Sequence, residues 1–315
     1  LKGATDTPWA GRLLADCIRD AGFPPGVFSY VTGRGSVVGE ALTSHPDLGG
    51  LTFTGSHDVG MSLYRKIAAG AHPRPCIAEM GGKNPCVVTA HADLDRAATG
   101  IVRSAFDLTG QKCSALSRVY VEEAVADPLL TRVTEKTVAI RVGDPCVREN
   151  WMGPVVNEAA AEAYVSYCDR LRRDGGRIRV GGTRLLDGDL AHGHFVAPTL
   201  AEAPPDHPLF REEMFQPILM VSRVKDLREG VARANDGALG LTAGCYGDDD
   251  EVRYFLDNIE AGVTYVNRPQ GATTGAWPGY QPFGGWKGSG STGKAIGSVY
   301  YLPQYLREQS QTVVE

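Results

Sequence analysis

The sequence has little that would cross-link it or hold a structural metal. Its seven cysteines are an odd number, and none forms a Cys-x-x-Cys pair. This spacing argues against a disulfide framework and a zinc ribbon, and it predicts a reducing, cytoplasmic environment and no metal site. The first residues contain neither an initiating Met nor the pattern of a signal peptide, so we expect further residues to precede Leu1.

Long hydrophobic runs and long basic runs are also missing. No apolar stretch is long enough to cross a bilayer, Lys and Arg do not cluster, and the formal net charge is −5. We therefore expect neither a membrane nor a nucleic acid as a partner. Hydrophobic residues make up 43% of the 315 residues and charged residues 22%, which is typical of a globular protein with one large domain or two ordinary ones.

Short apolar runs alternate with amphipathic segments, which predicts an α/β fold with crossover helices. A helix is expected from Pro8 to Ala21, followed by a turn and a strand that ends at Gly33. Gly33, Gly35 and Gly39 then open another helix. Their spacing is one residue away from a dinucleotide-binding fingerprint, and a Gly-rich turn without a ligand explains it equally well.

The segment GLTFTGS predicts a buried strand that breaks at Gly55 and leads into a helix whose apolar face includes Val59 and Ile67. Gly55 and Ser56 lie at the start of this helix, where free N–H groups and the helix dipole favour a phosphate group. Ser56 is equally well explained as an ordinary N-cap residue.

Two further segments contain candidate reactive side chains. In CIAEMGGKNP, Glu79 precedes Gly81 and Gly82, and in DLTGQKCSA, Cys113 follows a helix with an apolar face. Gly110 and the polar residues around Cys113 indicate an open turn with exposed backbone, an environment that favours a thiolate. The other cysteines are expected to be buried as small hydrophobic side chains.

The stretch GWKGSGSTGKAIG has the spacing of a nucleotide triphosphate loop at Gly288, Gly293 and Lys294. Ala295 stands where Ser or Thr would bind Mg²⁺. The preceding YQPFGGW is not a strand pattern, and Pro303 would interrupt a long helix after Lys294. An NTPase is therefore a remote alternative.

The chain contains these motifs in order: Lys2, FTGS with Gly60, the Glu79-Met-Gly-Gly-Lys run, GQKC, EEMFQP at 212–217 and PFGGWKGSG at 282–290. Their order and spacing resemble the aldehyde dehydrogenase superfamily over the whole chain, as the C-terminal portion of such an enzyme. The resemblance implies an α/β fold in three parts. These are the remainder of a Rossmann-like NAD-binding domain, incomplete here, at residues 1–78, an α/β catalytic domain at 79–297 and an oligomerisation tail at 298–315.

The resemblance also implies NAD(P)-dependent oxidation of an aldehyde to a carboxylate through a cysteine thioester, with Cys113 as the nucleophile and Glu79 as the general base. The implied cofactor-binding residues are Lys2, Gly55, Ser56, Gly60, Glu213 and Phe215. Thr5 stands where many members have a Glu that repels a 2′-phosphate, so NAD is expected and NADP stays open. A catalytically inactive relative that keeps the motifs by inheritance is the alternative.

The segment 267–297 resembles the anchor loop of the L-glutamate γ-semialdehyde (1-pyrroline-5-carboxylate) dehydrogenase branch, which acts in proline catabolism. In that branch a Thr-Gly-Ala loop presents backbone N–H groups to the substrate carboxylate. The implied substrate-binding residues are Ser114, Gly275 and Ala276. Trp277 and Pro278 depart from the branch, so another carboxylated semialdehyde, or a general aldehyde, is the alternative substrate.

The C-terminal tail contains more apolar residues than a solvated terminus needs, including Tyr300, Tyr301, Leu302 and Tyr305. Its QTVV segment fits a strand that extends the sheet of a neighbouring subunit, as relatives do. We therefore expect a homodimer or a higher homo-oligomer.

Overall fold

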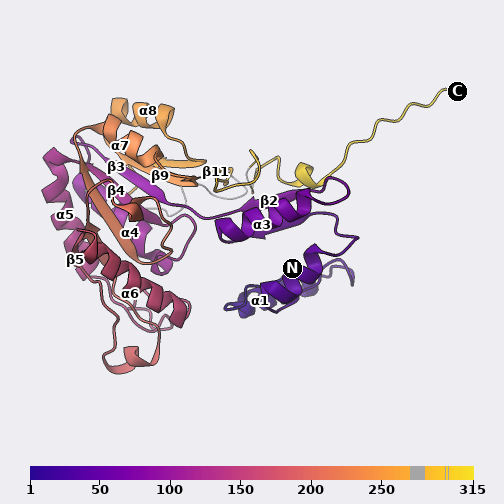
Figure 1. Ribbon diagram of the computed structural model, residues 1–315, viewed down its shortest axis with the longest axis horizontal. Coiled ribbons are helices and arrows are strands. Elements are labelled where there is room, and N and C mark those ends of the chain that lie inside the picture. The colour runs from indigo at the N-terminus through magenta and orange to yellow at the C-terminus, as the bar shows by residue number, and fades with distance from the viewer. Residues whose placement is uncertain (270–280, 295, 297) are drawn as a thin grey trace. The chain divides into compact units, whose positions relative to one another are not determined.

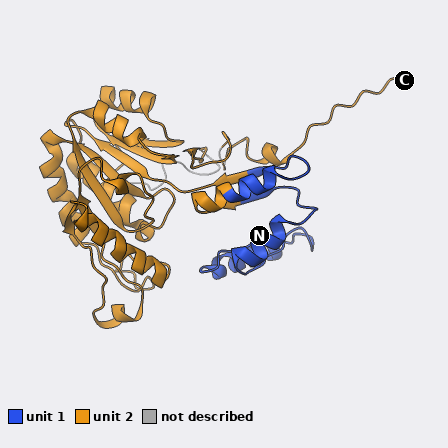
Figure 2. Ribbon diagram, viewed as in Figure 1, with its two compact units in different colours: residues 1–52, 62–76 blue, residues 53–61, 77–315 orange. Residues whose placement is uncertain are grey.

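The computed structural model describes residues 1–269, 281–294, 296 and 298–315. The chain divides into two compact units (Figure 2). The smaller unit contains Leu1–Thr52 and Ser62–Cys76, and the larger unit contains Phe53–Met61 and Ile77–Glu315. The division into three domains at 1–78, 79–297 and 298–315 stays a prediction.

The helical segments are α1 (Pro8–Asp20), the π-helical turn Gly35–Gly39, α2 (Glu40–Thr43), α3 (His57–Ala68), α4 (Leu94–Phe106), the 3-10 segment Asp107–Gly110, α5 (Glu123–Val138), α6 (Glu158–Arg173), the 3-10 turns Gly188–His192 and Pro208–Phe210, α7 (Leu227–Asn235), α8 (Asp249–Asn258) and the 3-10 turn Leu302–Tyr305. The strands are β1 (Leu51–Thr54), β2 (Cys76–Glu79), β3 (Asn84–Val88), β4 (Leu116–Glu122), β5 (Arg177–Val180), β6 (Thr199–Glu202), β7 (Ile218–Val224), β8 (Leu239–Gly240), β9 (Thr242–Tyr246), β10 (Val263–Val266) and β11 (Trp286–Lys287).

The smaller unit confirms two of the expected helices and corrects one strand. Helix α1 begins at Pro8, a position where the missing N–H leaves no helical hydrogen bond unmade. The turn Gly35–Gly39 leads into α2, as expected. The strand expected to end at Gly33 is wrong, because this segment forms only an isolated bridge between Val31 and Lys2 and has no further ladder.

The larger unit is built on a seven-stranded sheet with the order β10-β9-β3-β4-β7-β6-β5 (Figure 1). All neighbouring pairs are parallel except β5 with β6. Strands β3 and β9 are buried at every residue and β7 at all but one, which is typical of a sheet covered on both faces. The α/β fold class predicted from the sequence is therefore confirmed.

Alternate side chains of each strand pack into different layers of the core. In β3, Val87 belongs to one cluster with residues of α6, α7 and α8, whereas Cys86 and Val88 belong to a second cluster with residues of α4 and α5. Figure 1 shows these helices on the two faces of the sheet. The strands are thus held rigidly from both sides.

Neighbouring strands β9, β3, β4 and β7 all begin at one edge of this sheet, because they are parallel. Their first residues are Thr242, Asn84, Leu116 and Ile218. The segments that lead into these strands therefore converge on the same edge. They contain the candidate residues Glu79, Cys113, Glu213 and Phe215.

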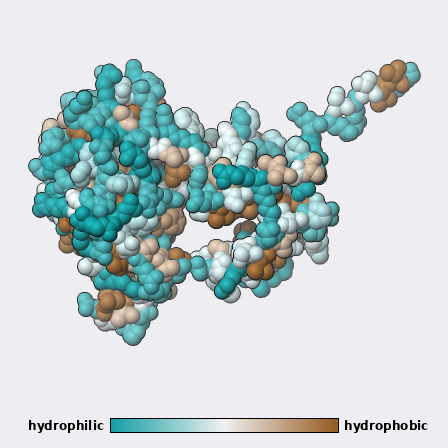
Figure 3. All heavy atoms as spheres, viewed as in Figure 1, coloured by the Kyte–Doolittle hydropathy of each residue, from teal (hydrophilic) through white to brown (hydrophobic). Residues whose placement is uncertain are grey.

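The tail after Tyr305 contains no helix or strand, so the QTVV segment is not a strand in this single chain. Its Val313 and Val314 are 85% and 88% exposed, and Figure 3 shows apolar residues near the end of this extended segment. Elsewhere the visible face is mainly polar (Figure 3). Among the described residues, no helix has the length and apolar character needed to cross a membrane.

Candidate active site

Glu79 is a buried carboxyl group at the end of β2, with 6% of the residue exposed. The Gly285 N–H donates to Glu79 Oε2 at 3.1 Å, and the Met80 N–H donates to Ser289 O at 2.8 Å. The Gly-rich segment therefore holds both the strand end and its carboxylate. Burial raises the pKa of Glu79 to about 7, although the Gly285 hydrogen bond lowers it. The group is balanced between its acid and base forms near neutral pH.

Cys113 lies half-buried in the turn before β4, where its side chain packs against Leu241, Val263 and Phe283. Burial raises the pKa of the thiol, and the nearby carboxyl groups of Glu213 and Glu79 raise it further. Backbone hydrogen bonds from Ser114 and from Cys113 itself lower it.

The expectation of an open turn that favours the thiolate is therefore corrected. Cys113 is partly buried, and its thiol interacts electrostatically with the carboxyl groups of Glu213 and Glu79. In this arrangement the thiol form is favoured at neutral pH, and the backbone N–H groups are the donors that stabilise the thiolate once it forms.

The approach to Cys113 contains a rare run of left-handed backbone. Leu108, Thr109 and Gly110 have φ values of 48°, 61° and 64°. This conformation costs energy for the two non-glycine residues, above all for β-branched Thr109, and such strain gathers at functional sites. At Gly110, a side chain would meet Gln216 O at 2.6 Å, so glycine is required there.

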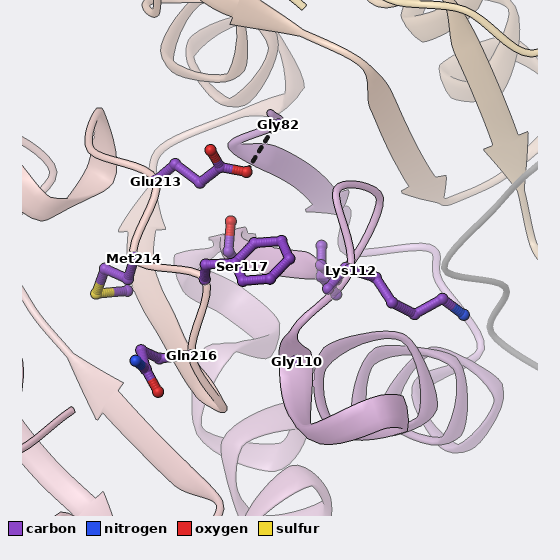
Figure 4. A pocket seen from close by; sticks show the side chains of 10 residues that line it. Gly82, Gly110, Lys112, Ser117, Glu213, Met214 and Gln216 are labelled. Carbon is purple, nitrogen blue, oxygen red and sulfur yellow. Dashed lines mark hydrogen bonds between the residues drawn. The ribbon is translucent and has the colours of Figure 1, made fainter. Parts of the chain in front are cut away.

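Glu213 is fixed beside the Gly81-Gly82 turn. The Gly82 N–H donates to Glu213 Oε1 at 2.9 Å, and any side chain at Gly81 would overlap the same carboxyl group (Figure 4). Burial raises the pKa of Glu213, while the Gly82 hydrogen bond and then the charge of Lys83 lower it. Phe215 follows with a left-handed φ of 55° and is 44% exposed.

These segments line a small pocket, formed by Gly82, Gly110, Lys112, Ala115, Leu116, Ser117, Glu213, Met214, Phe215 and Gln216. Figure 4 shows Glu213 and Gly82 on one side of it and Lys112 on the other. The Lys112 ammonium pairs with Asp107 at 3.3 Å. Glu213 is thus the carboxyl group that this pocket presents.

The start of α3 also reaches the Glu79 segment. The Gly55 N–H donates to Glu79 O at 3.2 Å, and Gly60 N–H donates to Ser56 O at 2.9 Å. A side chain at Gly60 would meet Met80 Sδ at 2.5 Å, so this helix packs closely only because Gly60 has no Cβ. On the predicted apolar face, Ile67 is buried, but Val59 is 49% exposed.

The other predicted site residues are Lys2, Ser114, Gly275 and Ala276. Lys2 belongs to the smaller unit, where its ammonium donates to Gly3 O at 2.8 Å. Ser114 is buried beside Cys113, with 3% of the residue exposed, and Thr242 Oγ1 donates to its carbonyl at 3.4 Å. Gly275 and Ala276 of the predicted anchor loop lie outside the described residues.

Two of the other cysteines do not have the expected environment. Cys76, Cys86, Cys168 and Cys245 are buried, as predicted, but Cys17 and Cys146 are exposed. Cys17 lies on α1, a helix without buried residues, and Cys146 lies in a surface turn where its N–H donates to Asp144 Oδ1. The apolar character of cysteine was therefore not sufficient to predict the burial of Cys17 and Cys146.

The Gly288–Lys294 segment does not have the form of a phosphate-binding loop. The two-residue strand β11 comes before it, and the Lys294 ammonium lies 4.3 Å from the centre of the Tyr300 ring. Up to Leu302 no helix follows it within the described residues, so no helix N-terminus supports a phosphate there.

Three buried polar residues near the site were not predicted. Ser289 Oγ donates to Gly81 O at 2.7 Å and accepts from the Gly240 N–H at 3.0 Å. Asn84 bonds to the Cys113 turn. Lys83 is 2% exposed, and its ammonium has no hydrogen-bond partner among the described residues. The available sequence signal was the pair of polar residues at the start of the apolar run: Lys83 directly precedes β3, and Asn84 is its first residue.

Outside this site, the side chains of His91, Asp248 and Glu251 are close enough together to hold a metal ion. Hydrogen bonds already account for their arrangement. Asp248 and Glu251 form a capping box at α8, and His91 Nδ1 lies 2.9 Å from Glu251 Oε1. The capping of α8 and the contact of His91 with Glu251 therefore explain why these three side chains lie together.

A family model for the aldehyde dehydrogenase family matches residues 1–311. The chain belongs to the aldehyde dehydrogenase family. Among curated relatives, it is 38% identical over 322 residues to a 1-pyrroline-5-carboxylate dehydrogenase of Geobacillus sp. (strain WCH70), covering 100% of this chain and 60% of that protein. It is 39% identical over 321 residues to 1-pyrroline-5-carboxylate dehydrogenase 1 of Halalkalibacterium halodurans, with the same coverage.

Solved aldehyde dehydrogenase structures have the same fold. The structure of 1-pyrroline-5-carboxylate dehydrogenase from Thermus with bound NAD has a TM-score of 0.90 and 36% identity, covering 97% of this chain and 58% of that one. A bifunctional proline utilization A protein has a TM-score of 0.89 and 35% identity, covering 98% and 31%. The chain thus spans about 60% of the length of the curated relatives it matches.

Proposed function

We propose that these residues carry out the NAD-dependent oxidation of L-glutamate γ-semialdehyde, the open form of 1-pyrroline-5-carboxylate, to L-glutamate. One observation carries the proposal: in addition to burial and Glu213, the buried carboxyl of Glu79 raises the pKa of the Cys113 thiol, and the pKa of Glu79 itself is about 7, so the two groups interact electrostatically. A thiol and a carboxyl near neutrality are the groups that thioester formation and hydrolysis need. The names of the relatives point to the substrate.

The residues around Glu213 fit a dinucleotide. Gly81 leaves room for the Glu213 carboxyl, Gly60 lets α3 pack against Met80, and the start of α3 offers backbone N–H groups to a phosphate. Glu213 and Phe215 would hold the nicotinamide ribose, and Gly55 and Ser56 the pyrophosphate. When bound, NAD supplies the acceptor for the hydride that leaves the substrate carbon.

Cys113 provides the covalent step. Its thiolate adds to the aldehyde carbon, and in this proposal the backbone N–H of Cys113 donates to the oxygen that becomes negative. Loss of the hydride from this adduct leaves a thioester on Cys113. Because two carboxyl groups raise the pKa of the thiol, formation of the thiolate is the step that this site has to assist.

Glu79 provides the hydrolytic step. A water molecule adds to the thioester carbon and gives its proton to the Glu79 carboxylate, and the C–S bond then breaks to release the carboxylic acid and the Cys113 thiolate. With a pKa of about 7, Glu79 is a base strong enough to accept this proton and is still largely ionised at slightly alkaline pH.

Ser114 is our proposed contact for the substrate carboxylate, together with Gly275 and Ala276. It is buried and follows Cys113 directly in the chain. A site with such donors disfavours an uncharged aldehyde, because each donor left unpaired costs about 1–3 kcal/mol.

The test uses the protein at its natural length and compares kcat/KM for glutamate semialdehyde, succinate semialdehyde and hexanal. The absorbance of reduced nicotinamide measures each rate. We expect glutamate semialdehyde to be preferred and Ser114→Ala to reduce this preference by roughly tenfold. If kcat/KM is highest with succinate semialdehyde, the substrate is a carboxylated aldehyde other than glutamate semialdehyde. A best rate with hexanal, or an unchanged preference in Ser114→Ala, would contradict the substrate assignment.

A further inference from the structure

Asn84, the first residue of β3, connects the turn of Cys113 to two strands. Its side-chain Nδ2 donates to Cys113 O and to Ala115 O, each at 2.8 Å. Its Oδ1 accepts from the Thr242 N–H at 3.0 Å, at the start of β9. The residue is 2% exposed, and both ends of its amide are used.

The backbone cannot hold this turn in the same way. Asn84 pairs with Leu116, but Pro85 pairs with Arg118, so the register between β3 and β4 shifts at this point. Pro85 also has no N–H to donate. The ladder is therefore interrupted at Ser117, near the start of β4, and the Asn84 amide supplies two donors to carbonyl groups of the turn that precedes this strand.

Gly82 makes the contact tight from the other side. A side chain at Gly82 would overlap Cys113 O and would meet Asn84 Oδ1 at 2.6 Å. The N–H of the same Gly82 holds Glu213. The carbonyl of Cys113, the amide of Asn84 and the carboxylate of Glu213 are thus packed around a single glycine, and a shift of one displaces the others.

We propose that Asn84 is a positioning residue that fixes the turn of Cys113, so that the backbone N–H groups of Cys113 and Ser114 point at the sulfur atom and at the developing oxyanion. Its importance for turnover rests on the proposed function. Its effect on the sulfur does not, because those N–H groups stabilise the thiolate whether or not a substrate is present.

The variants Asn84→Asp and Asn84→Ser separate positioning from simple packing. Asn84→Asp keeps the shape and the acceptor for Thr242, but it has no donors and directs a carboxylate oxygen at two carbonyl groups. Asn84→Ser keeps one short donor and removes the repulsion. The matched control is Asn235→Asp, because Asn235 Nδ2 donates to Asn258 O at 2.8 Å and its Oδ1 accepts from the Glu260 N–H at 2.9 Å, at the end of α7.

The first measurement is the rate of alkylation of Cys113 by iodoacetamide as a function of pH, without cofactor. Cys17→Ser and Cys146→Ser are introduced first, since both thiols are exposed. We expect both Asn84 variants to need a higher pH for alkylation and to react roughly 10-fold more slowly at neutral pH, with Asn235→Asp unchanged. This result does not depend on the identity of the substrate.

The second measurement is turnover with glutamate semialdehyde and NAD. We expect kcat to fall roughly 10- to 100-fold in Asn84→Asp and less in Asn84→Ser, with the affinity for NAD changed by less than about twofold. If Asn84→Asp does not fold, Asn84→Ser decides the question. An alkylation profile that matches the parent protein, or a loss of thermal stability equal to that of Asn235→Asp with no change at the sulfur, would overturn the proposal.

Discussion

Gly81 lies directly against the carboxyl group of Glu213, so that a methyl group at Gly81 would overlap Glu213 Oε2. The same carboxyl group accepts the Gly82 N–H at 2.9 Å. Gly81 and Gly82 are therefore needed for two different reasons, although the sequence shows only two adjacent glycines. Gly81 makes room for Glu213, and Gly82 binds it.

The first prediction concerns this contact. Gly81→Ala should displace the Glu213 carboxylate and slow hydride transfer roughly 10-fold, much as Glu213→Ala should, because both remove the same contact to the nicotinamide ribose. Single-turnover formation of reduced nicotinamide measures this step. The control is Gly293→Ala, because a Cβ there meets open space. Normal single-turnover rates in Gly81→Ala would show that the Glu213 position is not critical.

The second prediction assigns the nucleophile. Cys113→Ala should retain the fold and NAD binding and should lose the oxidation of aldehyde and the burst of reduced nicotinamide, since no other group forms the thioester. Stopped-flow absorbance and calorimetry measure the two properties. Cys146→Ala, on an exposed thiol, should leave both unchanged. Turnover that survives in Cys113→Ala would refute the assignment.

The third prediction concerns Glu79. Glu79→Gln should reduce steady-state turnover by roughly 10²-fold, because thioester hydrolysis loses its base, while a burst of reduced nicotinamide persists. The burst persists because the Glu79 charge raises the pKa of the Cys113 thiol, so its removal makes the thiolate easier to form.

The pH dependence separates these two roles of Glu79. In the parent protein, thioester hydrolysis should increase as pH rises through about 7, because the deprotonated carboxylate is the active form. This inflection should be absent in Glu79→Gln, and alkylation of Cys113 should move to lower pH in the same variant. Loss of the burst with unchanged NAD binding would mean that Glu79 also deprotonates Cys113.

Much of the fold was accessible from the sequence because it depends on local patterns. The apolar run of β3 and the periodicity of α4, with Ile101, Ala105 and Phe106 buried, predict a covered parallel sheet and its helices. The strand expected before Gly33 failed for a non-local reason, since strand formation requires a partner ladder and this segment has one bridge only.

The candidate site was predictable in its reactive groups but not in their environment. Glu79 and Cys113 are marked by their motifs, whereas the role of Asn84 depends on a register shift between β3 and β4 that local pattern does not reveal. The raised pKa of the Cys113 thiol likewise comes from burial and from carboxyl groups that are remote in sequence. The burial of the Lys83 side chain also depends on tertiary packing, so a local sequence pattern does not reveal it.

Lys83 is that buried cation, and it gives the fourth prediction. Burial, and after it the charge of the nearby Arg118, lower the pKa of Lys83 from its ordinary value of 10.5 to about 7, although Glu213 and Glu212 raise it. Below pH about 7 the folded and unfolded chains both carry the proton, so the folded state bears the full cost of a buried charge. Replacement by an apolar side chain of similar length should remove this cost.

Lys83→Met should therefore increase the free energy of unfolding at pH about 7 by on the order of 3 kcal/mol. Between pH about 7 and about 10 the folded state has released its proton while the unfolded state still holds it, so the stability of the parent protein rises with pH and the advantage of Lys83→Met shrinks. Urea unfolding across this range measures the difference. Lys225→Met, at an exposed lysine, should show neither effect. A destabilised Lys83→Met at every pH would instead mean that the ammonium is paired within the folded protein.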